Sequence, residues 1–157
     1  MNNMHEKFGS LSFALESNLN DFKMGSACHS YLVSCLLSRG NIFHTRSLGY
    51  VLVKSTQQVY VPHFWNVISV GDKEWIVDFN LSLNNVLEEA APEVPFGIFN
   101  KEHYSEYEYV VTEVQNKPYD KQLFSDLTGN KFSEVGLPQY LCDAVNHEIC
   151  LAQSLYW

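Results

Sequence analysis

Two β-like runs separated by a very short turn constrain the fold of this chain more than any other feature of its sequence. Residues 63–70 and 74–80 are rich in β-branched and aromatic side chains, and Gly71-Asp72 lies between them. A glycine followed by a polar residue suits a tight two-residue hairpin turn. Strands joined by such a turn run antiparallel. The sequence therefore predicts a sheet that is at least partly antiparallel.

Segments with helical periodicity lie on both sides of these strands. Apolar residues recur at helical spacing in residues 11–23 and 28–39, and again in residues 138–155. The remaining predictions are strands over 48–54 and 104–115, a loop over 55–60 and an irregular stretch over 81–100. Helices followed by strands and then by a closing helix are typical of an α+β protein.

The predicted helix over residues 28–39 begins at a cysteine. Ser26 is a candidate N-cap, and Gly40 suits the position just beyond the C-terminus of the helix. A helical repeat of 3.6 residues places Cys28 on the same stripe as Leu32 and Leu36. Cys28 is therefore expected in the first turn of a helix whose inner face is otherwise core.

The composition favours one acidic globular domain. The 157 residues, 46% of them apolar, suffice for a single hydrophobic core over residues 1–157. The net charge is −8 and no basic stripe occurs, which argues against nucleic acid and against an anionic membrane surface as partners. The acidity fits either solubility or a basic protein partner, and the sequence leaves the oligomeric state open.

The sequence also bears on where the protein resides. No run approaches the ~20 apolar residues of a transmembrane helix, so no membrane partner is expected. The first residues, Met-Asn-Asn-Met-His-Glu-Lys, lack the basic-then-apolar pattern of a signal peptide. We therefore expect a protein that is cytoplasmic where it is made, with secretion without a cleaved signal peptide left open.

The four cysteines, Cys28, Cys35, Cys142 and Cys150, include no Cys-x-x-Cys pair of the kind found in zinc and redox sites. The first two lie on one predicted helix with their Cα atoms about 10.5 Å apart, which is too far for a disulfide. A disulfide between Cys142 and Cys150, which lie eight residues apart on another predicted helix, is excluded in the same way. The sequence therefore predicts free thiols in a reducing environment.

The sequence contains a candidate catalytic triad of a thiol nucleophile, a histidine and an aspartate. Its members are Cys28 at the start of a predicted helix, and His63 and Asp78 in the two strands of the predicted hairpin. A helix N-terminus favours a thiolate, and a histidine within hydrogen-bond reach can take the thiol proton. An aspartate on the far ring nitrogen would fix the imidazole tautomer and stabilise the imidazolium. The free N–H groups of the first helical turn, including that of Cys28, can bind an oxyanion.

The hairpin gives this hypothesis a geometric test. If Gly71-Asp72 forms a two-residue turn, His63 and Asp78 become diagonal neighbours on one face of the sheet, about 7–8 Å apart between Cα atoms. A side-chain hydrogen bond is then within reach. A three-residue loop would instead place the two side chains on opposite faces.

Other conspicuous residues are expected to have structural roles. His29 adjoins Cys28, but neighbours on a helix do not face the same way, so we expect it at the surface. Three aromatic residues of the 104–115 strand fit either strand composition or a protein-binding groove, with the former favoured. The residues assigned to packing or to a solvated surface are His44, His103, His147, Trp65, Trp75, Tyr104, Tyr107 and Tyr109.

The segments around the three candidate residues resemble the transglutaminase-like superfamily of papain-related thiol enzymes. The resemblance covers residues 24–82, about half of the chain. Its most specific part runs from His63-Phe-Trp-Asn-Val to Trp75-Ile-Val-Asp78. The other matching motifs are Gly25-Ser-Ala-Cys28, Leu36-Leu-Ser-Arg-Gly40 and Arg46-Ser-Leu-Gly-Tyr-Val.

This resemblance implies a nucleophile helix packed on an antiparallel sheet, with Cys28 as nucleophile, His63 as general base and acid, and Asp78 as the orienting group. It implies no cofactor and no metal. The reaction implied is hydrolysis at an amide carbonyl of a protein or peptide, either deamidation of a glutamine, as by bacterial effector-like enzymes, or peptide cleavage.

Two alternatives stay open at this point. One is acyl transfer to an amine acceptor, as transglutaminases perform. A calcium-dependent crosslinking enzyme is disfavoured, because the sequence has no calcium-loop carboxylate cluster and no tryptophan upstream of Cys28. The other alternative is a non-catalytic protein-binding module with the same fold.

Overall fold

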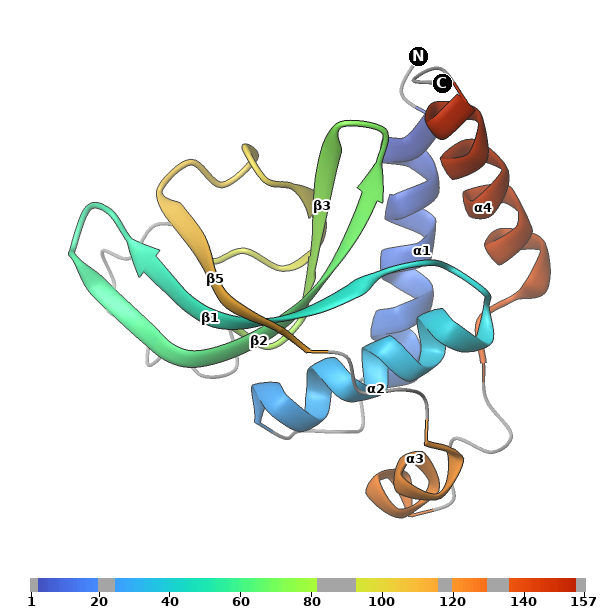
Figure 1. The fold of residues 1–157 in the computed structure, drawn as a ribbon, viewed down its shortest axis with the longest axis horizontal. Helices are drawn as coiled ribbons and strands as arrows, with labels where there is room; N and C mark the ends of the chain where they lie inside the picture. The colour runs from blue at the N-terminus through green and yellow to red at the C-terminus, as the bar shows by residue number, and fades with distance from the viewer. Residues whose placement is uncertain (1–2, 20–24, 82–92, 116–119, 130–135, 155–157) are drawn as a thin grey trace.

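The computed structural model describes residues 3–19, 25–81, 93–115, 120–129 and 136–154, which contain four helices and five strands (Figure 1). The helices are α1 (Asn3–Leu19), α2 (Ser26–Arg39), α3 (Lys121–Thr128) and α4 (Gln139–Ser154). The strands are β1 (Thr45–Val53), β2 (Gln58–Val70), β3 (Lys73–Asp78), β4 (Gly97–Asn100) and β5 (Tyr107–Gln115).

The strands form one five-stranded sheet in the order β4-β3-β2-β1-β5. Every neighbouring pair in this sheet is antiparallel. The predicted α+β class is therefore confirmed, with a sheet that is antiparallel throughout the described residues.

One face of the sheet is covered by helices α1, α2 and α4. Apolar side chains from these helices meet those of β2 and β3 in a single buried cluster, which forms the larger core of the protein. Its helical members include Phe8, Leu11 and Leu15 of α1, Leu32 and Leu36 of α2, and Val145 and Ile149 of α4. Helix α2 lies across the sheet and contacts β2 and β1 (Figure 1).

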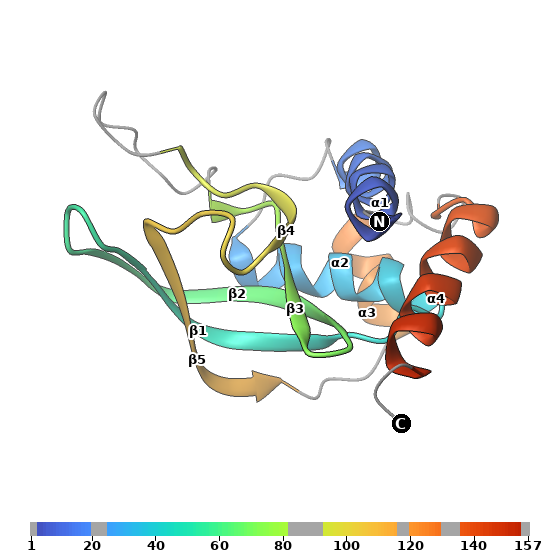
Figure 2. The same cartoon turned by 90° about the horizontal axis from the view of Figure 1, so that it is seen from above.

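The opposite face of the sheet is concave. All five strands contribute side chains to a second buried cluster there, which includes Trp65 of β2 and Tyr107 of β5. The rings of Phe99 and Tyr109 lie 5.9 Å apart, although they belong to β4 and β5 at opposite edges of the sheet. Figure 2 shows the curvature that makes this contact possible. The sheet is thus rolled, and residues of β3 and β5 can meet across its inside.

The predicted hairpin between β2 and β3 is confirmed in its turn length and its register. Val70 pairs with Lys73, so only Gly71 and Asp72 lie in the turn. Gly71 has φ of 62°, a left-handed conformation that glycine adopts without strain. This register places His63 and Asp78 on the same face of the sheet.

Several element boundaries differ from the prediction. Strand β2 begins at Gln58, inside the predicted loop, and the short strand β4 lies within the predicted irregular stretch. Helix α3 was not predicted, because its eight residues are too few to show a clear period. The carboxylate of Asp120 caps it by accepting from the N–H groups of Gln122 and Leu123. Residues 20–23, 82–92 and 155 of the predicted segments lie outside the described residues.

Helix α2 begins differently from the prediction. The N-cap is Gly25 rather than Ser26, and Gly25 has no side chain with which to cap the first turn. Gly40 ends the helix as expected, and its N–H donates to the carbonyls of Leu36 and Leu37. The close packing of Cys142 Sγ against Gly40 leaves no room for a larger residue there.

All four cysteines are free, as predicted. Cys35 and Cys142 are buried, Cys28 is half-buried, and Cys150 is exposed. Among the described residues, no helix has the length and apolarity needed to cross a membrane.

Candidate active site

A buried hydrogen bond joins His63 of β2 to Asp78, the last residue of β3. His63 Nε2 lies 2.8 Å from Asp78 Oδ2, and the two residues are only 2% and 3% exposed. This contact follows from the two-residue turn, which brings both side chains to the concave face of the sheet. The predicted His–Asp pair therefore exists in the structure.

Two further donors hold the Asp78 carboxylate. The Tyr109 hydroxyl donates to Oδ2 at 2.8 Å, and the Asn80 N–H donates to Oδ1 at 2.9 Å. Burial raises the pKa of Asp78, but the charge of His63 and the hydrogen bonds from His63, Asn80 and Tyr109 outweigh it and hold this pKa below 3.8. Asp78 is therefore an ionised carboxylate at neutral pH.

The ionised carboxylate fixes the tautomer of His63. A carboxylate only accepts hydrogen bonds, so the hydrogen in the His63–Asp78 contact must be on Nε2. In the neutral ring, Nδ1 then carries the lone pair and is the nitrogen that can take a proton from a nucleophile. This is the tautomer that a general base needs.

Aromatic rings hold the imidazole of His63 in place. The Trp65 ring stacks on it at 5.9 Å between centroids, and the Tyr109 ring lies at 6.4 Å. Trp65 and Tyr109 also pack edge to face at 5.1 Å. The imidazole is therefore oriented both by hydrogen bonding and by packing.

Tyr109 is the member of this cluster that sequence reasoning missed as a functional residue. It belongs to β5, which is separated from β3 in the sheet by β2 and β1. Burial, and then the charge of Asp78, raises the pKa of Tyr109 well above 10, so the phenol stays protonated and donates. No local pattern predicts this contact, because it depends on how far the sheet is rolled.

Cys28 lies in the first turn of α2, as predicted, and is half-buried. The N-cap is a glycine, and within the described ranges no side chain is recorded as accepting the N–H groups of this turn. Among the hydrogen bonds of the described residues, none joins Cys28 to His63. The structure thus brings His63 and Asp78 together, but it shows no hydrogen bond between the Cys28 thiol and the His63 imidazole among the described residues.

Three side-chain hydrogen bonds fix the first turn of α2 to the sheet. On β1, Arg46 donates from Nη2 to the Ala27 carbonyl at 2.6 Å and from Nε to Ser30 Oγ at 3.0 Å. On β2, Asn66 Nδ2 donates to the Ser30 carbonyl at 2.9 Å. Arg46 and Asn66 are paired across the two strands. Cys28 therefore lies in a turn whose position is set by β1 and β2.

His29 is buried, at 3% exposure, so its prediction as a surface residue is wrong. Burial lowers the pKa of His29, while the charge of Asp78 raises it by a smaller amount. The first turn of α2 is thus within electrostatic range of Asp78. The prediction assumed one buried stripe, but β1, β2 and α3 all contact α2 and bury it on more than one side.

The other residues weighed at the sequence level mostly have structural roles. Trp65 and Trp75 are buried, as predicted. The His44 ring is held between Ser34 Oγ, at 2.6 Å from Nε2, and the Ile42 carbonyl, at 2.8 Å from Nδ1. His103 and His147 are exposed.

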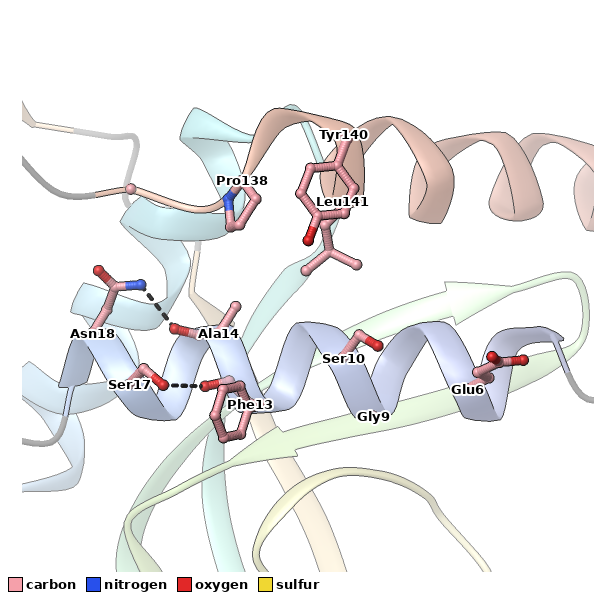
Figure 3. A pocket seen from close by; sticks show the side chains of 11 residues that line it. Glu6, Gly9, Ser10, Phe13, Ala14, Ser17, Asn18, Pro138, Tyr140 and Leu141 are labelled. Atoms are coloured by element: carbon pink, nitrogen blue, oxygen red, sulfur yellow. Dashed lines mark hydrogen bonds between the residues drawn. The ribbon is translucent and has the colours of Figure 1, made fainter.

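No group of three or more histidine, cysteine, aspartate or glutamate side chains in the described part of the chain could hold a metal ion. The structure also has a groove of about 840 Å³ between α1 and the segment that leads into α4 (Figure 3). Phe13 and Tyr140 flank it, and none of the three candidate residues lines it. A smaller hollow of about 350 Å³ includes Tyr109 in its lining.

No protein-family model matches this chain, and comparisons with curated proteins and with solved structures give no match either. The likeness to transglutaminase-like enzymes therefore rests on the sequence motifs.

Proposed function

We propose that this protein is a thiol-dependent hydrolase that acts on an amide carbonyl of a protein or peptide. The observation that carries the proposal is the buried 2.8 Å hydrogen bond between His63 and Asp78. Structural histidines are common, but this one has a fixed tautomer and an ionised partner, Asp78, whose charge acts on His29, the neighbour of Cys28. These are the supports that a thiol nucleophile requires.

The reaction would use each group in turn. His63 Nδ1 takes the Cys28 proton, and the thiolate attacks the carbonyl carbon of the amide. The C–N bond then breaks, and the leaving nitrogen takes the proton from the imidazolium, which gives ammonia or an amine and a thioester on Cys28. Water attacks the thioester with His63 again as base, and a carboxylic acid and the free thiol are released.

Two parts of the fold support the charged intermediates of this reaction. Asp78 stabilises the imidazolium through its hydrogen bond to Nε2. The uncapped N–H groups at the start of α2, including that of Cys28, are donors for the oxyanion. Neither contribution requires a cofactor.

The proposed substrate is a side-chain or backbone amide of another protein. Glutamine deamidation and peptide cleavage are the two hydrolytic forms of the proposal, and acyl transfer is the form in which an amine replaces water. Deamidation would release ammonia, peptide cleavage would release a new amino terminus, and acyl transfer would leave a new amide.

A non-catalytic binding module is the second candidate function. The observation that favours it is that no hydrogen bond joins Cys28 to His63 among the described residues. Catalytic hydrogen bonds are often long in enzymes without substrate and shorten when it binds, so a hydrolase is compatible with the same observation.

Acylation by p-nitrophenyl acetate tests the proposal without knowledge of the natural substrate. We expect a burst of nitrophenolate, acetylated Cys28 in the peptide mass spectrum, and slow return of the free thiol. Added methylamine would give N-methylacetamide if the enzyme is an acyltransferase. Cys28→Ser and His63→Ala should both abolish the burst, whereas Cys150→Ser, at an exposed thiol, should retain it.

A burst that survives Cys28→Ser would refute the proposal. So would acetylation of Cys28 and Cys150 at equal rates, since this is the behaviour of ordinary thiols. Either result would leave the binding module as the better account of the fold.

A further inference from the structure

Arg46 of β1 is a buried cation with an unusual set of neighbours. It is 8% exposed, and it forms no ion pair with an aspartate or glutamate among the described residues. A buried charge is costly unless an opposite charge or strong hydrogen bonds compensate for it. The lack of a carboxylate partner therefore needs an explanation.

The contacts of Arg46 in the structure are with neutral groups. Its two hydrogen bonds go to the Ala27 carbonyl and the Ser30 hydroxyl. Its guanidinium carbon lies 4.9 Å from the centre of the Phe64 ring and 5.7 Å from that of Tyr31. A neutral donor could make the same hydrogen bonds, so these contacts explain the position of Arg46 but not the need for its charge.

Three groups that can become anions act electrostatically on Arg46. Burial lowers the pKa of Arg46, and the charges of Cys28, Tyr31 and Cys35 raise it, with Cys28 the strongest of the three. Burial raises the pKa of Cys35 to about 11 and also raises that of Tyr31, so both stay neutral at pH 7. Of the three, only Cys28 lies between the two residues, Ala27 and Ser30, to which Arg46 is hydrogen-bonded.

The other titratable groups around this turn do not alter the assignment. Asp120, which precedes α3, affects Tyr31 and Cys35 but is not among the groups that shift the pKa of Arg46. Burial lowers the pKa of His29, so this neighbour of Cys28 is neutral at pH 7. Neither His63 nor Asp78 is among the groups that shift the pKa of Arg46.

We propose that Arg46 is a positioning residue that stabilises the thiolate of Cys28. The guanidinium is held against the first turn of α2 by its bonds to Ala27 and Ser30, on either side of Cys28 in sequence. Its charge adds to that of the helix N-terminus. This inference rests on the proposed function, because it assigns Arg46 to the same thiol.

Arg46 and His63 would then have different roles at the Cys28 thiol. His63 accepts the proton of the thiol, whereas an arginine stays protonated and contributes only its charge. Loss of Arg46 should therefore move the pH at which Cys28 becomes reactive. It should leave the reactivity at high pH, where the thiol is ionised in any case, almost unchanged.

The test is the pH profile of Cys28 alkylation by iodoacetamide, measured by peptide mass spectrometry in Arg46→Gln, Arg46→Met and Arg46→Lys. We expect Arg46→Gln and Arg46→Met to raise the midpoint by about one pH unit or more, which lowers the rate below the midpoint about tenfold. Arg46→Lys keeps the charge and should retain most of the wild-type midpoint. Cys150 in the same digests is the control thiol.

The outcomes separate this inference from the proposed function. An unchanged midpoint in folded Arg46→Gln, or an equal shift in all three variants, overturns the role of the Arg46 charge. A midpoint that moves in His63→Ala and not in Arg46→Gln leaves the hydrolase proposal standing without this inference. A midpoint that moves only in the Arg46 variants supports the inference and counts against His63 as the base.

A second measurement applies if the Arg46 variants do not fold. In the His63→Ala background, the unfolding free energy is compared with and without Cys28→Ser across the pH range. A thiolate held by Arg46 predicts a difference that grows as pH rises. A difference that does not depend on pH overturns the inference.

Discussion

Two polar clusters lie on opposite faces of the same sheet, and they differ in how their charges are balanced. On the concave face, Asp78 is surrounded by donors from His63, Tyr109 and Asn80. On the helical face, the described residues that contact Arg46 are all neutral, and none of them gives Asn66 Oδ1 a hydrogen-bond partner.

This difference indicates a division of roles. The concave cluster is complete in itself, which suits a base that must be held in one tautomer. The helical-face cluster holds the turn that carries Cys28 and supplies a charge that its own members do not neutralise. The first cluster should therefore matter most for stability, and the second for the reactivity of the thiol.

The largest expected effect is on the concave cluster. Asp78→Ala removes the acceptor for His63 and Tyr109, which leaves buried donors without a partner. We expect a loss of about 3–5 kcal/mol in unfolding free energy, measured by urea denaturation. Glu108→Ala, at an exposed position of β5, is the control and should change it by less than about 0.5 kcal/mol. Equal effects of the two substitutions would contradict this account of the cluster.

A substitution at Gly49 tests the pairing of β1 with β5 in the sheet that carries both clusters. Gly49 lies on β1 opposite His63, and an added Cβ would overlap the Val110 carbonyl oxygen of β5. Gly49→Ala must push the two strands apart, at a cost of about 3 kcal/mol in unfolding free energy. Gly9→Ala in α1, where a Cβ meets nothing within 4 Å, should instead stabilise the protein by about 0.5–1 kcal/mol. The opposite ranking in thermal or urea unfolding would argue against the described pairing of β1 with β5.

A smaller effect is expected from Tyr109→Phe, which removes one of the donors to Asp78. The loss of a hydrogen bond to a charged acceptor should cost about 1.5–3 kcal/mol in unfolding free energy. Tyr140→Phe, at a side chain that is 78% exposed, is the matched control. If both tyrosine variants unfold at the same urea concentration as the wild type, the Tyr109–Asp78 bond does not contribute.

The smallest expected effect is on the pH dependence of the unfolding free energy, through His29 of α2. Burial lowers the pKa of His29 from 6.5, with a smaller opposing effect from Asp78, and burial also lowers that of His44. The unfolded chain therefore binds more protons than the folded one as pH falls below 6.5, and stability decreases in that range. His29→Gln should flatten this decrease in unfolding free energy, and His103→Gln, at an exposed position, should not. A decrease that is equally steep in both variants would mean that His29 is not buried in its neutral form.

The sequence predicted the parts of the site that depend on local pattern. A two-residue turn fixes the register of its hairpin, so the His63–Asp78 contact could be predicted from Gly71-Asp72 and strand alternation. The first-turn position of Cys28 followed in the same way from helical spacing.

The parts that failed depend on how distant elements pack. Tyr109 reaches Asp78 only because the sheet is rolled, and strand alternation carries no information about curvature. His29 is buried because α2 is covered on more than one side, whereas its helical position alone suggested the surface. Arg46 was part of a motif, but its place against the Ala27 carbonyl follows from the docking of α2 on β1.

The most direct test of the central claim is the alkylation rate of Cys28 relative to that of Cys150 at pH 7, in the wild type and in His63→Ala. The account predicts that Cys28 reacts at least about tenfold faster than the exposed Cys150, and that His63→Ala removes this advantage. A Cys28 that reacts no faster than Cys150, and equally fast in both proteins, would contradict the claim that His63 activates it.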